Sequence, residues 1–369
     1  MKIVHMTSVH HAYDTRILHR QCLAAIDAGM KVILIAPHRH DEHYKGVHIK
    51  SVQQIDNPRR RLLVGAINVL KLALRERGDV YQFHDPELIP VGVVLSLLGK
   101  KVIYDVHEEY TKDFLTKEWI PRKLRRPASL AISLLEKAAQ GFFSGIVAAT
   151  PTIANQFPPS KTITVQNFPK KSELSSMTSL PYSERGYKII YIGNITEIRG
   201  IREMVTSVNY ASNKLAAPLS LELGGSFSPL ELREAVLRIP GWHNVNYWGF
   251  LNRDEVAEIM GTARIGLLLF HPTPNHLEAL PNKLFEYMSV GIPIIASNFP
   301  LWTKIINETR CGLVVNPKIP QETAEAIEYL INNQKEAEAM GYRGQEAVEN
   351  IYSWEPQAQK LIALYRSMQ

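Results

Sequence analysis

The strongest constraint on the fold is the alternation of short apolar runs with helical patterns along the whole chain. Runs of this kind are typical of parallel strands that are buried on both faces, and strands that alternate with helices build doubly wound sheets. We therefore predict a parallel α/β domain in the first half. The strand-like runs of this half are Lys2–Met6, Val32–Ala36, Val80–Phe83, Val102–Tyr104 and Ile146–Ala149.

The alternation restarts after the segment Gln166–Gly186, which is rich in Pro, Ser and charge and has no apolar period. This break predicts two Rossmann-like doubly wound parallel-sheet domains joined by a linker. The expected parts are a first domain over 1–170, a linker over 171–186, a second domain over 187–351 and a C-terminal helix over 352–369. The strand-like runs of the second half are Lys188–Ile192, Leu219–Leu223, Val245–Trp248, Ile265–Phe270, Ile292–Ala296 and Gly312–Val315.

Composition agrees with two ordinary globular domains, since the 369 residues are 45% apolar and 21% charged. The two cysteines, Cys22 and Cys311, cannot build a disulfide framework and have no metal-ligand spacing, so we expect both to be core residues in a reducing compartment. The start of the sequence lacks the features of a signal peptide, and no apolar run reaches the length of a membrane span. The expected location is the cytoplasm.

A formal net charge of +6 is compatible with phosphate-bearing ligands, nucleic acid or an anionic membrane surface. Two basic clusters precede apolar helical patterns: Arg59–Arg61, and Arg122–Arg126 with Lys117 before it. These clusters either rest on anionic lipid at the inner face of the membrane or belong to ordinary amphipathic helices packed on a sheet. We expect no nucleic-acid partner.

The stretch Arg264–Ser297 contains strand, polar loop, short helix, glycine stop and second strand in close succession. We expect Pro281 in the first turn of the helix and Gly291 at its C-terminal end. A helix start directly after a parallel strand is an anion site, because its unpaired N–H groups and the positive end of the dipole favour phosphate. Glu278 and Glu286 lie on either side of this start, so a diphosphate flanked by two sugars could meet one carboxylate at each end.

The pattern Glu278-x7-Glu286, with ALPNKLF between and YMSVGIPIIAS after it, resembles the donor-binding signature of retaining GT-B glycosyltransferases of family 4. The resemblance implies two Rossmann-like domains that face a central cleft. It also implies that Glu278 accepts hydrogen bonds from the transferred hexose and that Glu286 binds the ribose hydroxyls. The backbone around Leu280, Asn282 and Lys283 would then cradle the diphosphate.

The loop after the first strand of the second domain, YIGNITEIRG, resembles the family element that supplies two cations to the diphosphate. Arg199 stands in place of the usual lysine, before Gly200. Asn194, after Gly193, stands where the family has an arginine, so one cation is missing or comes from elsewhere, with Lys283 as the candidate. An arginine suits the role because its guanidinium is permanently charged and matches phosphate oxygens.

The first domain carries D-x-R-I, H-D-P-E-L and D-x-H-E elements in the family's order, so the resemblance covers nearly the whole chain. His107 matches the family histidine near the donor sugar and the reaction centre, and we place it with Glu278 and Arg199 in the catalytic set. Asp14 either caps the helix that begins near Thr15 or contacts substrate. The candidates for acceptor contacts or for holding the cleft walls are Asp14, Arg16, His84, Asp85 and Glu108.

The resemblance implies transfer of a hexose from a nucleotide diphosphate sugar to a glycan or lipid-linked acceptor, with the C-terminal helix crossing back to the first domain. The chain has no Asp-x-Asp, which agrees with a reaction that uses no metal or other cofactor. The alternatives are a sugar-nucleotide epimerase and a non-catalytic sugar-nucleotide-binding protein. A glycoside hydrolase would not need the phosphate site, and a dehydrogenase would need a G-x-G-x-x-G after the first strand.

Overall fold

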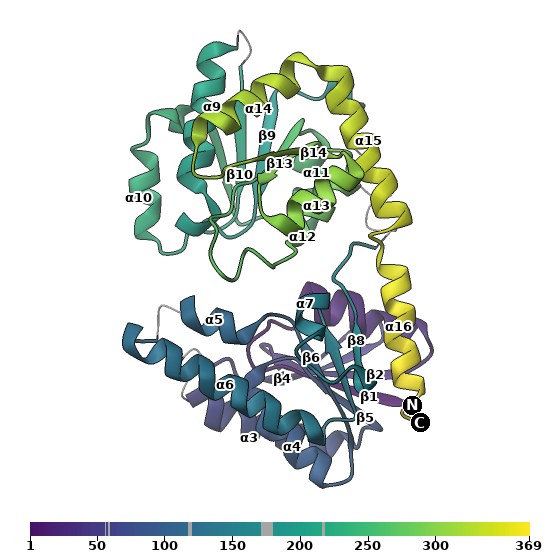
Figure 1. The fold of residues 1–369 in the computed structure, drawn as a ribbon. Helices are drawn as coiled ribbons and strands as arrows, with labels where there is room; N and C mark the ends of the chain where they lie inside the picture. The colour runs from purple at the N-terminus through teal and green to yellow at the C-terminus, as the bar shows by residue number, and fades with distance from the viewer. Residues whose placement is uncertain (56, 58–59, 117–119, 171–179, 216–217) are drawn as a thin grey trace. The chain divides into compact units, whose positions relative to one another are not determined.

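The computed structural model describes residues 1–369 except 56, 58–59, 117–119, 171–179 and 216–217, and each half of the described chain is built around a sheet whose strands are wholly or mostly parallel (Figure 1). The chain divides into two units. Unit 1 comprises Met1–Asn167 and Trp354–Gln369, and unit 2 comprises Phe168–Ser353.

Within the described residues, the sheet of unit 1 has eight strands in the order β3-β4-β2-β1-β5-β6-β7-β8. The edge strand β3 is antiparallel to β4, and the other described pairs are parallel. The order reverses direction between β1 and β5, which makes this the topological switch point of the sheet. The strands are β1 Lys2–Met6, β2 Lys31–Pro37, β3 Glu42–Tyr44, β4 Val47–Val52, β5 Val80–Phe83, β6 Lys101–Val106, β7 Gly145–Ala148 and β8 Thr162–Thr164.

Helices cover both faces of this sheet, and each face has its own apolar core. The α-helices are α1 Leu23–Asp27, α3 Ala66–Glu76, α4 Ile89–Leu97, α5 Tyr110–Thr116, α6 Arg125–Ala139, α7 Pro151–Ala154 and α16 Trp354–Arg366. The π-helical segments are η1 Thr15–Cys22 and η2 Arg61–Gly65. The 3-10 turns are η3 Pro86–Leu88, η4 Arg122–Leu124, η5 Gln140–Phe142 and η6 Pro159–Lys161.

The C-terminal helix α16 belongs to unit 1 although it follows the whole of unit 2 in the sequence. Its residues Trp354, Leu361 and Tyr365 are buried in the same core as Ile17 and Leu18 of η1. The Tyr365 hydroxyl donates to Gln82 Oε1 at 2.6 Å. The last helix therefore completes one face of the first sheet.

Within the described residues, the sheet of unit 2 has six parallel strands in the order β11-β10-β9-β12-β13-β14. This is the Rossmann order, with its switch point between β9 and β12. The strands are β9 Lys188–Ile192, β10 Ser220–Gly224, β11 Val245–Gly249, β12 Ile265–Leu268, β13 Ile294–Ser297 and β14 Gly312–Val315. The helices are η7 Tyr182–Glu184, η8 Glu197–Arg199, α9 Ile201–Lys214, α10 Glu231–Leu237, η9 Pro240–Asn244, α11 Arg253–Gly261, α12 Asn282–Ser289, α13 Pro300–Thr309, α14 Pro320–Asn332 and α15 Gln334–Asn350.

The end of the segment expected to be a linker is packed into unit 2 instead. Tyr182 and Arg185 are buried, and Arg185 donates to the carbonyl oxygens of Ala263, Val290 and Gly291 at 3.0 to 3.2 Å. A polar, aperiodic sequence does not reveal this, because backbone carbonyls from distant loops satisfy the guanidinium. Residues 171–179 of the expected linker lie outside the described residues.

Some expected boundaries differ from the structure. The run Ile265–Phe270 forms a strand only to Leu268, and the Ser297 hydroxyl lies 3.1 Å from the Leu268 carbonyl oxygen and 2.8 Å from that of Phe270.

The two cysteines, Cys22 and Cys311, are buried and free, as expected. Among the described helices, none has the length and apolar character needed to cross a bilayer.

Candidate functional site

The two loops at the switch point of unit 2 carry most of the predicted donor-site residues. One loop runs from Gly193 to Gly200 after β9, and the other runs from Leu269 to Pro281 after β12. These strands are neighbours at the centre of the sheet, with Ile189 paired with Ile265. Ligands of open α/β sheets bind at the carboxyl ends of the strands at such a point, so the topology brings the two loops to the expected edge.

Backbone contacts hold the two loops together. Gly200 has a φ of +77°, and a Cβ added there would lie 2.0 Å from the Leu269 carbonyl oxygen. The His271 N–H donates to the Ile198 carbonyl oxygen at 2.8 Å. Only glycine combines the left-handed backbone with this close approach, so Gly200 fixes the position of the preceding Arg199.

Arg199 lies over the ring of Phe270, with its guanidinium carbon 5.3 Å from the ring centroid. Gly193 is beside it, since a Cβ there would lie 3.6 Å from an Arg199 nitrogen. Burial lowers the pKa of His276, and the positive charge of Arg199 acts in the same direction. The arrangement places one permanent cation on an aromatic face, next to a histidine held neutral. Asn194 is exposed, and its carbonyl oxygen accepts from the Tyr191 hydroxyl at 2.9 Å.

The helix α12 begins one residue later than expected. Pro281 has extended backbone (φ −70°, ψ 134°) and is the N-cap, so Asn282 is the first helical residue. Pro281 has no side-chain hydrogen bond to offer, and its carbonyl oxygen accepts from the Leu284 N–H at 3.1 Å. The start of α12 therefore presents backbone N–H groups without a side-chain cap from Pro281, as an anion site requires.

The two predicted carboxylates flank this helix start. Glu278 and Leu280 are half-buried in the loop, and the indole of the buried Trp302 fixes that loop by donating to the Ala279 carbonyl oxygen at 2.7 Å. Glu286 forms an ion pair with Lys283 one turn earlier in the helix. Lys283 and Glu286 were both predicted to bind donor, and in the structure these two side chains contact each other.

The switch point of unit 1 gathers three further loops at the carboxyl ends of neighbouring strands. Residues 7–14 follow β1, His84 and Asp85 follow β5, and His107 follows β6. The rings of His84 and His107 are 5.1 Å apart, and those of His10 and His107 are also 5.1 Å apart. The topology thus assembles histidines that are far apart in the sequence.

Asp105, at the end of β6, is the centre of a buried hydrogen-bond network. Arg16 donates to both of its oxygens, at 2.7 and 3.2 Å, and Gln21 donates at 2.7 Å. His84 Nδ1 and His107 Nε2 each lie 2.9 Å from Oδ2. Although burial opposes ionisation, the charge of Arg16 and the histidine contacts hold the pKa of Asp105 well below its usual range. The carboxylate is therefore an anion that organises its neighbours.

This anion fixes the orientation of His107. Because Asp105 can only accept, the network assigns a proton to His107 Nε2 and leaves Nδ1 as the second functional nitrogen of the ring. His84 is fully buried, and burial lowers its pKa. Because its side chain is still 10% exposed, His107 is the histidine of the network that remains accessible to a ligand.

A second buried carboxylate, Asp85, shapes the loop after β1. It accepts from the Thr7 hydroxyl at 2.8 Å, the Ser8 N–H at 2.6 Å and His10 Nδ1 at 2.8 Å. Burial opposes the charged form of both partners, but the hydrogen bond and the charge of Asp85 raise the pKa of His10 to about 9. The same contacts hold the pKa of Asp85 well below its usual range. The two side chains therefore form an ion pair at neutral pH, in which Asp85 is buried and His10 is 30% exposed.

These contacts show what the first-domain candidates do within unit 1. Asp14 is the N-cap of η1 and accepts from the Arg16 and Ile17 N–H groups at 2.8 and 2.9 Å. Arg16, His84 and Asp85 are at most 4% exposed. These four residues hold the loops in place in the structure, and direct acceptor contact by Asp14, Arg16, His84 or Asp85 stays a prediction. Glu108 is exposed and keeps that expectation.

Sequence reasoning missed two residues of this site, Asp105 and His10. Asp105 is the first residue of the D-x-H-E element. The feature that could have indicated its role is its position as a carboxylate within the largely apolar run of a strand. His10 lies in the polar loop after β1, and no local pattern indicates its partner Asp85, which is 75 residues away.

Two groups within the described residues bring three candidate metal ligands together: His84, Asp105 and His107, and separately His38, His40 and Glu42. The first group does not fit a cation well, because the Arg16 guanidinium already occupies both oxygens of Asp105. In the second group, the described contacts of Glu42 are with Tyr13, His38 and His40.

Comparisons with known proteins agree with this architecture. Residues 176–347 match the sequence family described as glycosyl transferases group 1. An uncharacterized glycosyltransferase of Methanocaldococcus jannaschii is 21% identical over 178 residues, which is 48% of this chain and 44% of the relative. The capsular polysaccharide biosynthesis glycosyltransferase CapM of Staphylococcus aureus is 24% identical over 182 residues, 49% of this chain and 46% of the relative. The matches thus span about half the length of these relatives.

Solved structures resemble the whole chain. The sucrose-phosphate synthase of Thermosynechococcus elongatus superposes with a TM-score of 0.77 at 17% identity, covering 100% of this chain and 99% of the other. HepE of Anabaena, in complex with UDP and glucose, superposes with a TM-score of 0.72 at 14% identity and 100% coverage of both chains. The predicted GT-B fold is confirmed, and fold and family match together support a glycosyltransferase as the class of protein.

Proposed function

We propose that this chain is a retaining family 4 glycosyltransferase that moves a hexose from a UDP- or GDP-sugar to a hydroxyl of a glycan or lipid-linked acceptor. The observation that carries the proposal lies in unit 2: the loop with Arg199 and the loop with Glu278 are locked together at the switch point, directly before the start of α12. The capsular polysaccharide relative supports a place in surface polysaccharide or glycoconjugate synthesis.

In this proposal the donor lies across the start of α12. Its hexose hydroxyls donate to Glu278 and its ribose hydroxyls donate to Glu286. The diphosphate accepts from the backbone around Leu280, Asn282 and Lys283, with the Gly193–Asn194 turn beside it. When donor binds, the Lys283–Glu286 ion pair opens, so that Lys283 contacts a phosphate and Glu286 accepts from the ribose hydroxyls.

Arg199 supplies the charge that the departing diphosphate needs. Negative charge grows on the leaving oxygens as the bond to the anomeric carbon breaks, so a fixed guanidinium stabilises the transition state more than the ground state. The leaving phosphate takes the acceptor proton, and no protein carboxylate acts as nucleophile. His107 of unit 1 is the histidine that the family resemblance assigns to the transferred sugar, and its bond to Asp105 fixes the orientation of its ring.

The proposed transfer uses no metal ion at the diphosphate, because Arg199, Lys283 and the start of α12 provide the positive charge there. The expected result is that added Mg²⁺ or Mn²⁺ does not raise the transfer rate. A rate that depends on either ion would contradict this part of the proposal.

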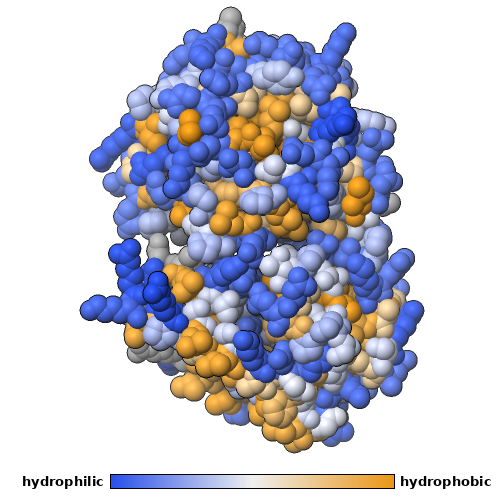
Figure 2. Space-filling view, viewed as in Figure 1, coloured by the Kyte–Doolittle hydropathy of each residue, from blue (hydrophilic) through white to orange (hydrophobic). Residues whose placement is uncertain are grey.

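We further propose that unit 1 binds the inner face of an anionic membrane through η4 and α6. Arg122, Lys123 and Arg126 are exposed, and Leu124, Leu130 and Leu134 beside them are 56 to 62% exposed. Figure 2 shows apolar side chains along this rim of unit 1 and strongly hydrophilic ones where α6 begins in Figure 1. Basic and apolar groups on one surface are typical of helices that lie on anionic lipid.

A groove beside α6 has room for part of a lipid-linked acceptor. It has a volume of about 570 Å³ and is lined by Thr111, Leu115, Arg126, Ser129 and Lys137, among others. The other basic cluster contributes less, because Arg61 makes a bidentate ion pair with Glu87, with contacts of 2.7 and 2.8 Å. Arg59 and Lys117 lie outside the described residues.

A thermal-shift screen against UDP, GDP, ADP and CMP and their common sugars tests the donor site. A ligand at 100 times its Kd stabilises the folded state by about 2.7 kcal/mol, which gives a clear shift. We expect one nucleotide diphosphate to shift the wild type without added metal, and Glu286→Ala to lose the shift. Glu258→Ala, which removes an exposed carboxylate of α11, is the matched control and should keep it.

Two outcomes contradict the proposal. If no nucleotide shifts the wild type, unit 2 does not bind donor. If a sugar nucleotide binds but no acceptor receives sugar and Glu278→Ala leaves the protein's output unchanged, the chain is a sugar-nucleotide-binding protein without transferase activity. Conversion of the bound sugar to its epimer without transfer would indicate an epimerase.

A further inference from the structure

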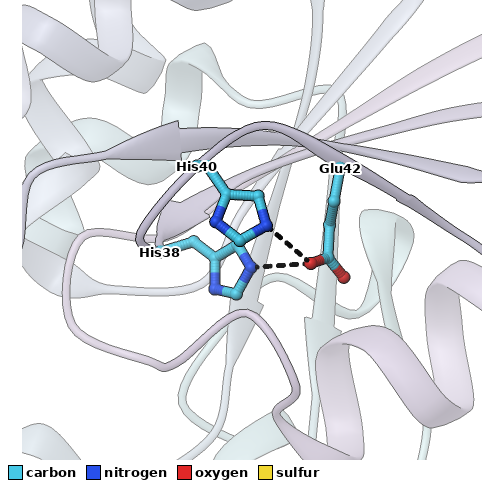
Figure 3. Close-up of side chains that lie close together, drawn as sticks. All are labelled: His38, His40 and Glu42. Atoms are coloured by element: carbon cyan, nitrogen blue, oxygen red, sulfur yellow. Dashed lines mark hydrogen bonds and ion pairs between the residues drawn. The ribbon is translucent and has the colours of Figure 1, made fainter.

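Three side chains at the edge of unit 1 converge outside the networks described so far. His38 and His40 lie in the loop between β2 and β3, and Glu42 is the first residue of β3. Figure 3 shows both imidazoles directed at the same carboxylate. His38 Nε2 lies 3.0 Å and His40 Nε2 lies 3.6 Å from Glu42 Oε2. The alternating H-x-H-x-E spacing brings all three ligand atoms to one point.

These separations match the edges of a small coordination tetrahedron. Zinc binds histidine nitrogen and carboxylate oxygen at about 2.0 to 2.2 Å, so two of its ligands in a tetrahedron lie roughly 3.3 Å apart. The two nitrogen–oxygen distances fall on either side of this value, and all the ligand atoms of the group lie within 4.8 Å of one another. A metal ion could enter with small side-chain rotations.

The surroundings hold two ligands and leave the third accessible. The side chain of His38 is 9% exposed, whereas that of His40 is 70% exposed. The Tyr13 hydroxyl donates to the other oxygen of Glu42, and the Tyr13 ring contacts His38 with the centroids 5.7 Å apart. A hydrogen bond to the second oxygen of a ligating carboxylate orients it, as outer partners of metal sites do.

We propose that His38, His40 and Glu42 bind one zinc ion, with the fourth position open to water or an anionic group. Two imidazoles and one carboxylate suit a borderline divalent ion, and three protein ligands leave one position free. Because Tyr13 belongs to the loop after β1, the ion braces the β2–β3 loop against that loop. This site is independent of the proposed transferase activity and of the diphosphate site in unit 2.

Isothermal titration of Zn²⁺ into the full chain, freed of any polyhistidine tag, tests the site. We expect one ion per chain, and we expect His40→Ala and Glu42→Gln each to weaken binding at least about tenfold. His40→Ala is the decisive variant, because an exposed loop side chain can be removed without harm to folding. Co²⁺ in place of Zn²⁺ should give the visible absorption of a four-coordinate ion in the wild type but not in His40→Ala or Glu42→Gln.

Two controls separate this site from other surface histidines. His243→Ala removes an exposed histidine of unit 2, and the double change of His43 and His48 to Ala removes the neighbouring pair on β3 and β4, whose ring centroids are 3.8 Å apart. Both variants should bind Zn²⁺ as the wild type does. No binding by the wild type, or unchanged binding by His40→Ala, would overturn the proposal and leave an ordinary histidine–carboxylate ion pair.

Discussion

At the scale of single residues, the clearest consequence concerns Asp105. Its replacement by Asn keeps the shape of the side chain but leaves the buried Arg16 guanidinium without its counter-charge. Removing one partner of a buried ion pair costs about 3–5 kcal/mol, so Asp105→Asn should sharply lower the unfolding temperature of unit 1. Calorimetry measures this change.

Asp41→Asn is the matched control, because Asp41 forms an exposed ion pair with Lys50 at 2.9 Å. Exposed pairs contribute between about 0 and 1 kcal/mol, so this variant should unfold close to the wild type. Equal destabilisation by the two changes would show that the Asp105 network has no special role in stability.

The His10–Asp85 pair makes the stability of unit 1 depend on pH. The folded-state pKa of His10 is raised to about 9 from 6.5, so its contribution is full below pH 6.5 and is lost as pH rises through 9. We expect the unfolding temperature of the wild type to fall between pH 7 and 9.5, by the equivalent of about 2 kcal/mol. His10→Gln should be less stable at pH 6 and should lack this decline. A parallel decline in both proteins would assign it to other groups.

Individual residues also show what the sequence can reveal about a site. The positions of Glu278 and Glu286 on either side of the start of α12 could be predicted, because they depend on a local strand, loop and helix. The role of Arg16 could not, since its partner Asp105 is 89 residues away and meets it only after the sheet has formed. A charged side chain gives no local sign of whether it faces a ligand or a buried counter-ion.

At the scale of elements, the contact between the η8 loop and the loop after β12 has a sharp test. Gly200→Ala places a Cβ against the Leu269 carbonyl in a left-handed conformation, so the two loops must separate. We expect a loss of about 1–3 kcal/mol in stability and the disappearance of the nucleotide-induced thermal shift.

Gly99→Ala is the control for Gly200→Ala. Gly99 has a similar φ of +74°, but an added Cβ would meet nothing within 4 Å. This variant should lose stability through backbone strain alone and should keep the nucleotide-induced shift. If both variants keep the shift, the contact between the two loops is not needed for donor binding.

The proposed membrane contact of η4 and α6 can be tested by reversing the charge of their basic residues. Each basic residue near an anionic surface contributes about 1 kcal/mol, so reversing Arg122, Lys123 and Arg126 to Glu should weaken binding to phosphatidylglycerol vesicles at least about 100-fold. Cosedimentation with such vesicles, and with neutral phosphatidylcholine vesicles for comparison, measures the change. Reversing Arg238, Lys304 and Lys335, exposed basic residues of unit 2, should have little effect. Similar losses in both variants would indicate that net charge alone governs binding.

The strands show which elements could be predicted. The runs Lys2–Met6, Val80–Phe83 and Lys188–Ile192 match β1, β5 and β9 at both ends, because central strands buried on both faces leave a continuous apolar signal. The missed strands β3 and β8 are the two edge strands of the first sheet, and the missed strand β4 lies between β3 and β2. Segments such as Glu42–Tyr44 are too short and polar to show a period.

At the scale of the whole molecule, unit 1 contains both ends of the sequence and unit 2 lies between them. The last helix, α16, should therefore contribute to the stability of the first sheet. Trp354, Leu361 and Tyr365 of α16 are at most 3% exposed. The Tyr365 hydroxyl is also linked to Asp105, because Gln82 donates to Gln21 at 2.6 Å and Gln21 donates to Asp105. The final residues of the sequence thus support the network that orients His107.

Ending the chain after Ser353 should therefore unfold unit 1 and spare unit 2. Burying one large apolar side chain contributes about 1.5–3 kcal/mol, so the loss of the three residues approaches the stability of an ordinary domain. We expect calorimetry of the truncated chain to lack the transition of unit 1 while the remaining transition still rises with the nucleotide that shifts the wild type. Leu361→Ala, which costs about 2–5 kcal/mol, should lower the transition of unit 1 alone. If truncation abolishes nucleotide binding as well, the donor site of unit 2 requires a folded unit 1, even though the two units have separate apolar cores.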